Sequence, residues 1–253
     1  MSDRRLALVT GGSSGIGAAT AEELARQGHD LVIVGRDRRR LDAVGRAVEQ
    51  QGVTATTVVA ELTGPAPEIA EAVEQAGRLD VFVHSAGDAR SGTIEELDDD
   101  DWAAAFATKL GGAVRVTRMV APPLRRSSTG AIVYVSGGAG LRPGPRHAAM
   151  GAVNAALLNL ARSTALLLAE DGVRVNAVAP GPVRTPRWGR LLAEASTSGH
   201  EPAHVEADVV AGIPMGRIAT AAQVAQVIAW LASPGASHLT GVIVPVDGGA
   251  SIS

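Results

Sequence analysis

The sequence contains no cysteine, which excludes disulfide bonds and thiolate-ligated metal sites. Aromatic residues make up only 2% of its 253 residues, against 30 glycines, so we expect a tightly packed interior of small side chains. The formal net charge is -3 and the charges are mixed, which argues against a nucleic-acid or membrane surface. No apolar run approaches the roughly 18 residues of a membrane span, and none resembles a signal peptide. We expect a cytoplasmic protein.

Short apolar runs alternate with helix-length amphipathic segments along almost the whole chain. The runs are continuous in Val, Ile, Leu and Ala, as in strands buried on both faces of a parallel sheet. The predicted strands cover residues 6–9, 31–34, 55–60, 81–84, 131–135, 174–179 and 242–246. Helices are predicted between them, for example over residues 18–27 and 221–232. This order predicts an α/β fold of the Rossmann type, a doubly wound parallel sheet of about seven strands with helices on both faces.

No linker rich in Pro, Ser and Gly divides the chain, so we expect a single domain over residues 1–253. The one irregular stretch is 186–212. An insertion near the carboxyl edge of a sheet is more often a mobile lid over a site than a separate domain. We therefore interpret 186–212 as a lid.

A glycine-rich loop follows the first predicted strand and opens a helix. Its residues run from Thr10 through Gly11, Gly12, Ser13, Ser14, Gly15 and Ile16 to Gly17. The backbone amides of such a loop, together with the helix dipole, can bind a pyrophosphate. The spacing alone is a weak signal, because a simple strand–helix turn also uses glycine.

The motifs that follow make the chain similar to the short-chain dehydrogenase/reductase family over essentially its whole length. The matching segments are 10–17, 79–81, 85–87, 173–176 with Pro180-Gly181, and 240–249. The resemblance implies a dinucleotide cofactor. It assigns the cofactor contacts to the loop residues Gly11, Ser13, Ser14, Gly15, Ile16 and Gly17, and to Ala86, Gly87, Pro180, Gly181, Val183 and Thr185. Among these, Thr185 would bond the nicotinamide carboxamide.

The end of the second strand indicates which dinucleotide is preferred. An acidic residue there accepts hydrogen bonds from a free 2'-hydroxyl, whereas a cation accommodates a 2'-phosphate. The chain has Gly35 where NAD-preferring relatives usually have Asp, and Arg36 follows it. The Arg36 guanidinium favours NADP(H) over NAD(H), unless it is merely a solvated residue at a helix start. Glu61 lies where the family commonly has an Asp that binds the adenine.

The family's catalytic residues are replaced in this chain. By alignment without gaps, the serine corresponds to Gly137, the tyrosine to Met150, the lysine to Asn154 and the asparagine to Lys109. Carbonyl reduction needs a hydride and a proton delivered to the developing alkoxide. Methionine has no ionisable proton, and asparagine supplies no positive charge to lower the pKa of a donor. Since acid–base assistance is typically worth ~10²–10⁴-fold, the family's standard mechanism is expected to fail.

Two side chains are candidates for the missing acid. Lys109 and Asn154 resemble a reciprocal exchange of the family's Asn and Lys, which would return a cation to the same pocket. His147 precedes Met150 by three residues, and its imidazole is a competent acid near neutral pH. The simpler interpretations are a surface His147, a solvated Lys109 and a Met150 that fills the core. Strand alternation is expected to turn Tyr134 and Ser136 away from the side that Gly137 faces.

Three functions remain open on the sequence alone. The first is an NADP(H)-dependent oxidoreductase with an unusual proton path, acting on an unidentified carbonyl or alcohol. The second is an inactive relative that serves as a cofactor-binding partner or regulatory subunit, in a mixed oligomer with an active homologue. The third is a non-redox enzyme that reuses the cleft. The resemblance implies a homotetramer or dimer, with 147–168 in one interface and the carboxyl-terminal segment in another.

Overall fold

Seven parallel strands form the centre of the molecule in the computed structural model, which describes residues 4–197, 199 and 201–252. The strands are β1 (Leu6–Thr10), β2 (Asp30–Gly35), β3 (Ala55–Val59), β4 (Val81–His84), β5 (Ala131–Val135), β6 (Arg174–Pro180) and β9 (Ile243–Val246). They pair in the order β3-β2-β1-β4-β5-β6-β9, and every neighbouring pair is parallel. The order reverses between β1 and β4, the switch point where ligands bind in doubly wound sheets. The predicted fold and its seven strands are confirmed.

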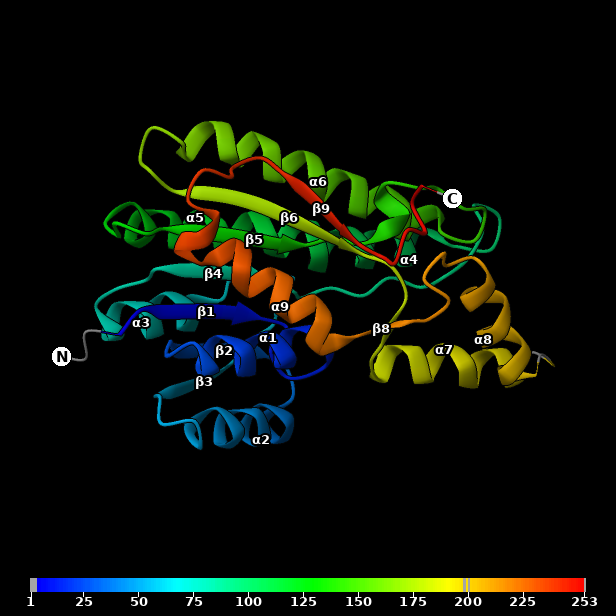
Figure 1. Cartoon of the computed structure of the whole chain (residues 1–253), viewed down its shortest axis with the longest axis horizontal. Helices are drawn as coiled ribbons and strands as arrows, with labels where there is room; N and C mark the ends of the chain where they lie inside the picture. Colours follow the sequence, from blue (N-terminus) through cyan, green and yellow to red (C-terminus); the bar gives the residue numbers. More distant parts are fainter. Residues whose placement is uncertain (1–3, 198, 200, 253) are drawn as a thin grey trace.

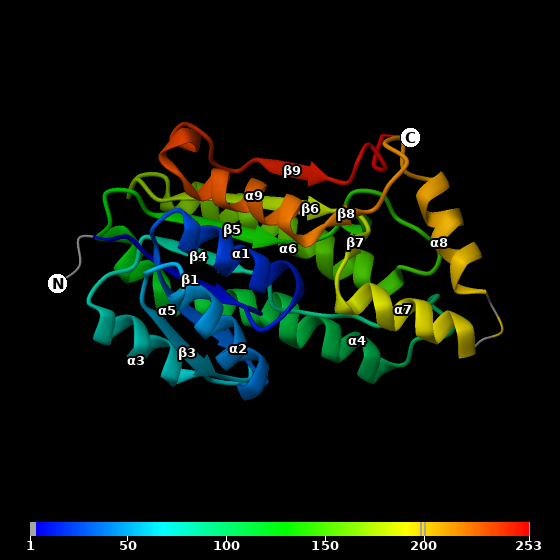
Figure 2. The same ribbon diagram turned by 60° about the horizontal axis from the view of Figure 1, so that its bottom comes forward.

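Helices cover both faces of this sheet (Figures 1 and 2). One face carries α1 (Gly15–Arg26), α2 (Arg38–Glu49) and α9 (Ala221–Ala232), and the other carries α3 (Pro67–Ala76), α5 (Gly112–Arg125) and α6 (Ala148–Leu168). Each layer buries its own apolar cluster against the strands. Because both faces are covered, the strands are apolar along their full length, as their sequences indicate.

The predicted helix 221–232 is confirmed, whereas the predicted helix 18–27 begins earlier, at Gly15. Its N-cap Ser14 has an extended backbone, and Gly15 enters the helix with a φ of 56°. Glycines are poor helix formers, so propensity placed the start at Ala18. The turn after β1 overrides that propensity.

The described residues of the segment 186–212 form two helices, which corrects its description as irregular. It contains α7 (Pro186–Thr197) and α8 (Pro202–Ala211), and a short parallel pair, β7 (Val183–Arg184) with β8 (Ala219–Thr220), lies at its base. Each helix starts at a proline. Proline has no backbone N–H, and the first helical turn tolerates this because N–H groups there have no intrahelical acceptor. Both helices lie beyond the carboxyl ends of the strands, at the end of the molecule opposite the amino terminus (Figures 1 and 2). We call this segment the lid.

The helix α6 is, among the described residues, the only one long and apolar enough to cross a membrane by length and composition. Its apolar side chains have another explanation in this fold. Leu157, Leu158, Ala161 and Leu168 are buried in the cluster that packs against the sheet. The composition of α6 is therefore that of a core helix.

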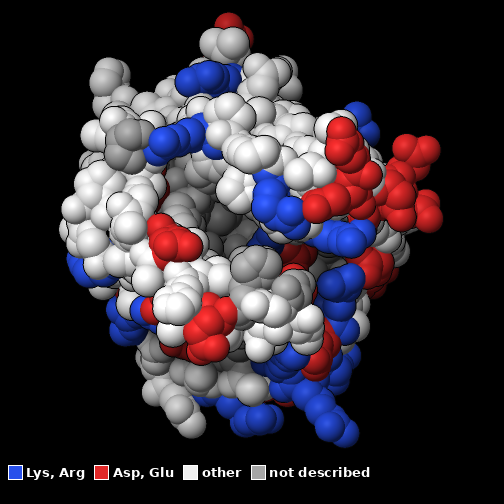
Figure 3. Space-filling view, turned by 90° about the vertical axis from the view of Figure 1, so that its right-hand side faces the viewer, with Lys and Arg blue, Asp and Glu red and all other residues white. Residues whose placement is uncertain are grey.

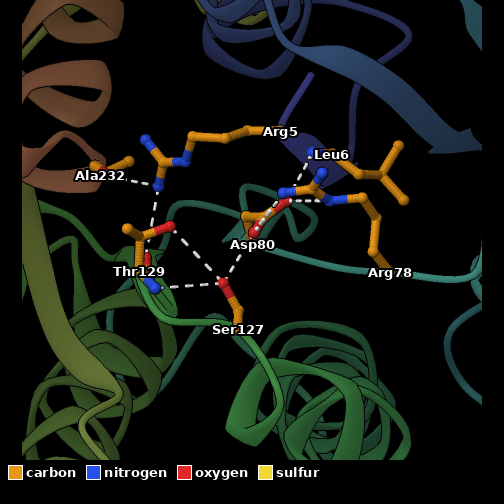
Figure 4. Close-up of polar contacts among 7 residues, drawn as sticks. All are labelled: Arg5, Leu6, Arg78, Asp80, Ser127, Thr129 and Ala232. Carbon is orange, nitrogen blue, oxygen red and sulfur yellow. Dashed lines mark hydrogen bonds and ion pairs between the residues drawn. The ribbon is translucent and has the colours of Figure 1, made fainter. Parts of the chain in front are cut away.

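A polar network closes the opposite end of the sheet, at the amino ends of the strands (Figure 4). The buried Asp80 carboxylate accepts hydrogen bonds from Arg78, from Ser127 and from the backbone amide of Leu6. Burial raises the pKa of Asp80, but these hydrogen bonds outweigh it, so the pKa lies below its ordinary value. Arg5 donates to the carbonyl groups of Thr129 and Ala232 across the same end. The network links β1, the residues before β4, the loop before β5 and the end of α9.

Candidate active site

A cleft with a volume of about 1460 Å³ opens at the carboxyl ends of the strands, between the sheet and the lid. Its walls come from the loop after β1, the ends of β2, β4, β5 and β6, the start of α6 and the inner side of α7. Figure 3 looks at this end of the molecule and shows a hollow with basic and acidic side chains around it. The cleft lies at the switch point between β1 and β4.

The glycine loop is built so that its backbone approaches other backbone closely. A Cβ on Gly11 would lie 2.7 Å from the backbone of Ser85 and Ala86, and Gly11 has a φ of 69°. A Cβ on Gly17 would lie 2.2 Å from the Gly11 carbonyl oxygen. Only glycine fits at these two positions, so the loop stays tight and keeps its amides at the start of α1.

The predicted cofactor residues gather in this cleft with one exception. The lining includes Gly11, Ser13, Ser14, Gly15, Ile16, Arg36, Glu61, Ala86, Gly87, Pro180, Gly181, Val183 and Thr185. The exception is Gly17, which is buried behind the loop and acts through the close approach described above. A cleft of this size, with a glycine loop at a helix N-terminus, fits a dinucleotide such as NAD(P)(H).

The two charged residues predicted to lie near the adenosine half, Arg36 and Glu61, follow β2 and β3. The Arg36 side chain is 72% exposed and pairs with Glu61 at 3.4 Å. Asp37 caps α2 by accepting from the Arg40 amide, and it also pairs with the Arg40 side chain. The Arg36 guanidinium is therefore held by one exposed carboxylate only loosely, since such exposed pairs contribute little.

Gly137 lies against the side chain of Asn154. A Cβ on Gly137 would lie 2.6 Å from Asn154 Nδ2. Asn154 is 2% exposed, and within the described part of the chain its Oδ1 has no hydrogen-bond partner. The amide of Asn154 thus lies where a side chain at position 137 would project. A larger residue at position 137 would therefore require the Asn154 amide to move.

Met150 lines the cleft on the same helical face as Asn154. Its Sδ accepts a weak hydrogen bond from Nη2 of Arg187 at 3.8 Å. The residue at the aligned tyrosine position therefore faces the cleft and a lid cation, so Met150 is not a core filler.

Lys109 is the only lysine of the chain, and its amine lies in the cleft. The Nζ atom donates to the Ser136 carbonyl at 2.9 Å, next to Gly137. Burial lowers the pKa of Lys109 from 10.5 to about 8. An amine with such a pKa exchanges protons near neutral pH, and the interpretation of Lys109 as a solvated side chain is wrong.

A π-helix positions Lys109, and a buried histidine holds that π-helix. The π-helix covers Phe106–Gly111, a rare geometry that is frequent at functional sites. His84 Nε2 donates to the Lys109 carbonyl at 3.0 Å, so Nδ1, at 2.9 Å from Thr10 Oγ1, accepts from that hydroxyl. Burial lowers the pKa of His84 to about 4 and keeps it neutral. The sequence analysis did not identify His84; its sequence signal is a histidine at the end of an otherwise apolar strand.

His147 lies at the rim of the cleft as the N-cap residue of α6. The side chain is exposed, and its Nδ1 approaches Gly144. Burial lowers the pKa of His147 from its ordinary value. The structure thus brings His147, Lys109, Met150, Gly137 and Asn154 to one cleft.

The two other hydroxyls near this site are engaged elsewhere. Tyr134, the only tyrosine of the chain, is fully buried and bonds Thr117 at 2.7 Å. Ser136 Oγ donates to the Asn154 carbonyl at 2.9 Å, so it lies against α6 rather than turned away from it. The backbone leaves strand geometry after Val135, so alternation does not extend to Ser136.

Three further cleft residues were not predicted from the sequence. Arg187 and Arg190 project from the first turns of the lid helix α7, and both pair with Asp88 in the loop after β4. The sequence signal is two arginines spaced i and i+3, which one helical face presents together.

Comparisons with known proteins agree over the whole chain. The family model described as enoyl-(acyl carrier protein) reductase matches residues 11–251. The chain is 37% identical to cis-4-hydroxycyclohexanecarboxylate dehydrogenase of Sinomonas cyclohexanicum over 249 residues, 97% of this chain and 96% of that protein.

Two solved structures share the fold closely. L-sorbose reductase of Gluconobacter frateurii, complexed with NADPH and L-sorbose, has a TM-score of 0.93 at 29% identity, covering 99% of this chain and 97% of that one. An NAD⁺-bound xylitol dehydrogenase has a TM-score of 0.92 at 28% identity, covering 97% and 98%. Relatives of the same shape therefore use either nicotinamide dinucleotide.

Proposed function

The chain belongs to the short-chain dehydrogenase/reductase family of oxidoreductases, and from that premise we propose that it interconverts a carbonyl compound and its alcohol with NADP(H). The observation that carries the proposal is one cleft that joins the glycine loop to the amine of Lys109. When bound, the nicotinamide supplies or accepts the hydride. The residues of the chain must then bind it and move the proton.

The cofactor residues follow from the cleft. The loop of Gly11, Ser13, Ser14 and Gly15 would hold the pyrophosphate at the N-terminus of α1, and Thr185 would bond the carboxamide. Arg36 supports a preference for NADP(H), because its guanidinium suits a 2'-phosphate and is loosely paired. Glu61, its present partner, would face the adenine.

Lys109 is the proposed proton donor in carbonyl reduction. Its ammonium loses one proton to the alkoxide oxygen and becomes a neutral amine, which a proton from solvent restores. In alcohol oxidation the neutral amine takes the hydroxyl proton. The Ser136 carbonyl holds the amine in place, and His147, at the rim of the cleft, is the second candidate acid.

The test replaces Lys109 with methionine, which keeps the length of the side chain and removes its proton. Turnover should fall ~10²–10⁴-fold in Lys109→Met, while the affinity for NADPH stays within twofold. In the same assay His147→Ala reports on the second candidate. Arg125→Ala, far from the cleft in an exposed pair with Asp171, is the control. Full turnover in both Lys109→Met and His147→Ala would contradict the proposed acid.

We further propose a cytoplasmic homotetramer with α6 in one interface. The exposed fractions of Leu166 and Leu167 on α6 are 82% and 68%, values that support a partner for this face. A Leu166→Lys, Leu167→Lys variant should shift the mass measured by light scattering from tetramer to a smaller species. A partner that is an active homologue would instead leave the purified wild-type chain without activity until that homologue is added.

A further inference from the structure

Two guanidinium groups of the lid hold one carboxylate inside the cleft. Arg187 and Arg190 lie one helical turn apart at the start of α7. Nη1 of Arg187 bonds Oδ1 of Asp88, and Nη2 of Arg190 bonds Oδ2 at 2.8 Å. The two oxygens of the carboxylate are thus shared between two cations. Charge-assisted hydrogen bonds from guanidinium groups are among the strongest that proteins make to a carboxylate.

Arg187 is placed where a substrate would react. Its Nη2 contacts the Ala89 carbonyl at 2.9 Å and Met150 Sδ at 3.8 Å, and position 150 aligns with the family's proton donor. Burial, and then the neighbouring Arg190, lower the pKa of the Arg187 guanidinium. A cation that is desolvated beside another cation is destabilised unless an anion accompanies both.

Asp88 meets that need only in part. The exposed fraction of its side chain is 52%, and it lies in the loop after β4, directly after Gly87. Because this carboxylate stays hydrated, another carboxylate that enters the cleft can replace it without a large loss of solvation. Two further arginines, Arg142 and Arg146, line the cleft beside His147, and Arg146 pairs with Glu96.

We propose that Arg187 and Arg190 form a binding site for a substrate carboxylate, and that Asp88 occupies this site when no substrate is present. The inference rests on the proposed function and names its substrate class as a small oxo acid or hydroxy acid. The substrate anion displaces Asp88 from the guanidinium groups, and the reacting carbon then lies near Met150 and Lys109. Neutral sugars and polyols lack the group that this site recognises.

A binding measurement tests the site without relying on turnover. The probes are cyclohexanecarboxylate and its neutral analogue cyclohexanecarboxamide, titrated by calorimetry into the full chain with saturating NADPH. The variants are Arg187→Gln and Asp88→Asn, and Arg125→Ala is the matched arginine control on the surface. The wild type should bind the carboxylate more tightly than the amide.

The two variants should change affinity in opposite directions. Arg187→Gln should weaken the carboxylate roughly tenfold, because a hydrogen bond to a charged group is lost. Asp88→Asn should tighten it severalfold, because the internal competitor is removed. A salt bridge that only fastens the lid predicts the same direction for both variants, and that result would overturn the inference.

Affinity for NADPH separates this site from the cofactor site. It should be the same in the wild type, Arg187→Gln and Asp88→Asn, and a loss in Arg187→Gln equal to that for the carboxylate would assign Arg187 to the cofactor and overturn the inference. Carboxylate binding with opposite shifts but no turnover of any oxo acid would refute the proposed oxidoreductase while it leaves the anion site intact. Equal affinity for carboxylate and amide would refute the site whatever the turnover.

Discussion

Asp80, at the amino ends of the strands, and Asn154, at the carboxyl ends, differ in how their buried side chains are hydrogen-bonded. At the amino ends of the strands, Asp80 receives hydrogen bonds from two side chains and a backbone amide. At the carboxyl ends, Asn154 Oδ1 lacks a hydrogen-bond partner among the described residues, and the buried Lys109 amine donates to the Ser136 carbonyl, a neutral acceptor.

The difference indicates which buried groups stabilise the fold and which are available for binding and catalysis. Buried polar groups that are satisfied stabilise a fold, whereas groups that are desolvated and incompletely paired have shifted pKa values and the capacity to bind something else. The network around Asp80 is therefore expected to control folding, and the cleft around Lys109 to control ligand binding and turnover.

The largest expected effect is on folding. Asp80→Ala removes the acceptor of the buried Leu6 amide and of the Ser127 hydroxyl, together with the ion-pair partner of the partly exposed Arg78. Each buried donor left unsatisfied typically costs about 1–3 kcal/mol. Urea unfolding should show this loss, and Asp171→Ala, in the exposed pair with Arg125, should cost less than about 1 kcal/mol. Equal losses in the two variants would contradict a special role for the amino-end network.

The lowered pKa of Asp80 predicts that the folded state loses stability in acid. Because the pKa of Asp80 is lower in the folded state than its ordinary 3.8, its contribution is present above that value. It is lost as the pH falls through the folded pKa. The free energy of unfolding should therefore fall below about pH 4 more steeply in the wild type than in Asp80→Asn.

At the other end of the sheet, the rate of turnover should depend on pH through the protonation of Lys109. With a pKa of about 8, Lys109 is an acid below that pH and a base above it. Carbonyl reduction should slow about tenfold per pH unit above 8, and alcohol oxidation should rise through the same value. Since the chain has one lysine, reductive ¹³C-methylation labels Lys109 and the α-amino group alone, so NMR can follow its titration directly. A lysine signal that titrates near 10.5 would refute the proposal that Lys109 is the catalytic acid.

A smaller effect is expected from restoring the family's serine. Gly137→Ser places a side chain against Asn154 Nδ2, and overpacking of this kind costs about 1–3 kcal/mol. Asn154→Ala should relieve the clash, so the double variant should be more stable than additivity predicts. Additive losses in thermal unfolding would show that the two positions are independent.

The smallest effect concerns the cofactor. Arg36 is exposed, so Arg36→Leu should cost only about 1 kcal/mol of NADPH binding, roughly fivefold, with NADH unchanged. Titrations that follow nicotinamide fluorescence measure both affinities. An equal loss for the two dinucleotides would assign Arg36 to the shared part of the cofactor.

The elements and most of the site were predictable because their signals are local. Continuous apolar runs predict buried parallel strands, and every predicted strand end agrees with the structure to within one residue. The glycine loop is recognisable because its conformation excludes side chains at Gly11 and Gly17. The replaced positions 137, 150 and 154 could be found by counting along one strand and one helix.

The lid and its charges were not predictable in this way. The sequence indicates an irregular segment at 186–212, yet two helices form there, and Pro186 and Pro202 both stand in a first turn, where proline is tolerated. Asp88 and Arg187 are 99 residues apart, and nothing in their separate surroundings connects them. His84 similarly reaches Lys109 only through the packing of β4 on the π-helix.

The sequence by itself determined the fold and the family, and it predicts the replacement of the usual catalytic residues, since each depends on spacing along the chain. Only the tertiary structure decided that Lys109 is desolvated, that Asn154 fills the space beside Gly137, and that two arginines share one carboxylate. The physical reason is that a pKa, a clash and an ion pair depend on distances between groups remote in sequence, which close only when the sheet and its helices assemble.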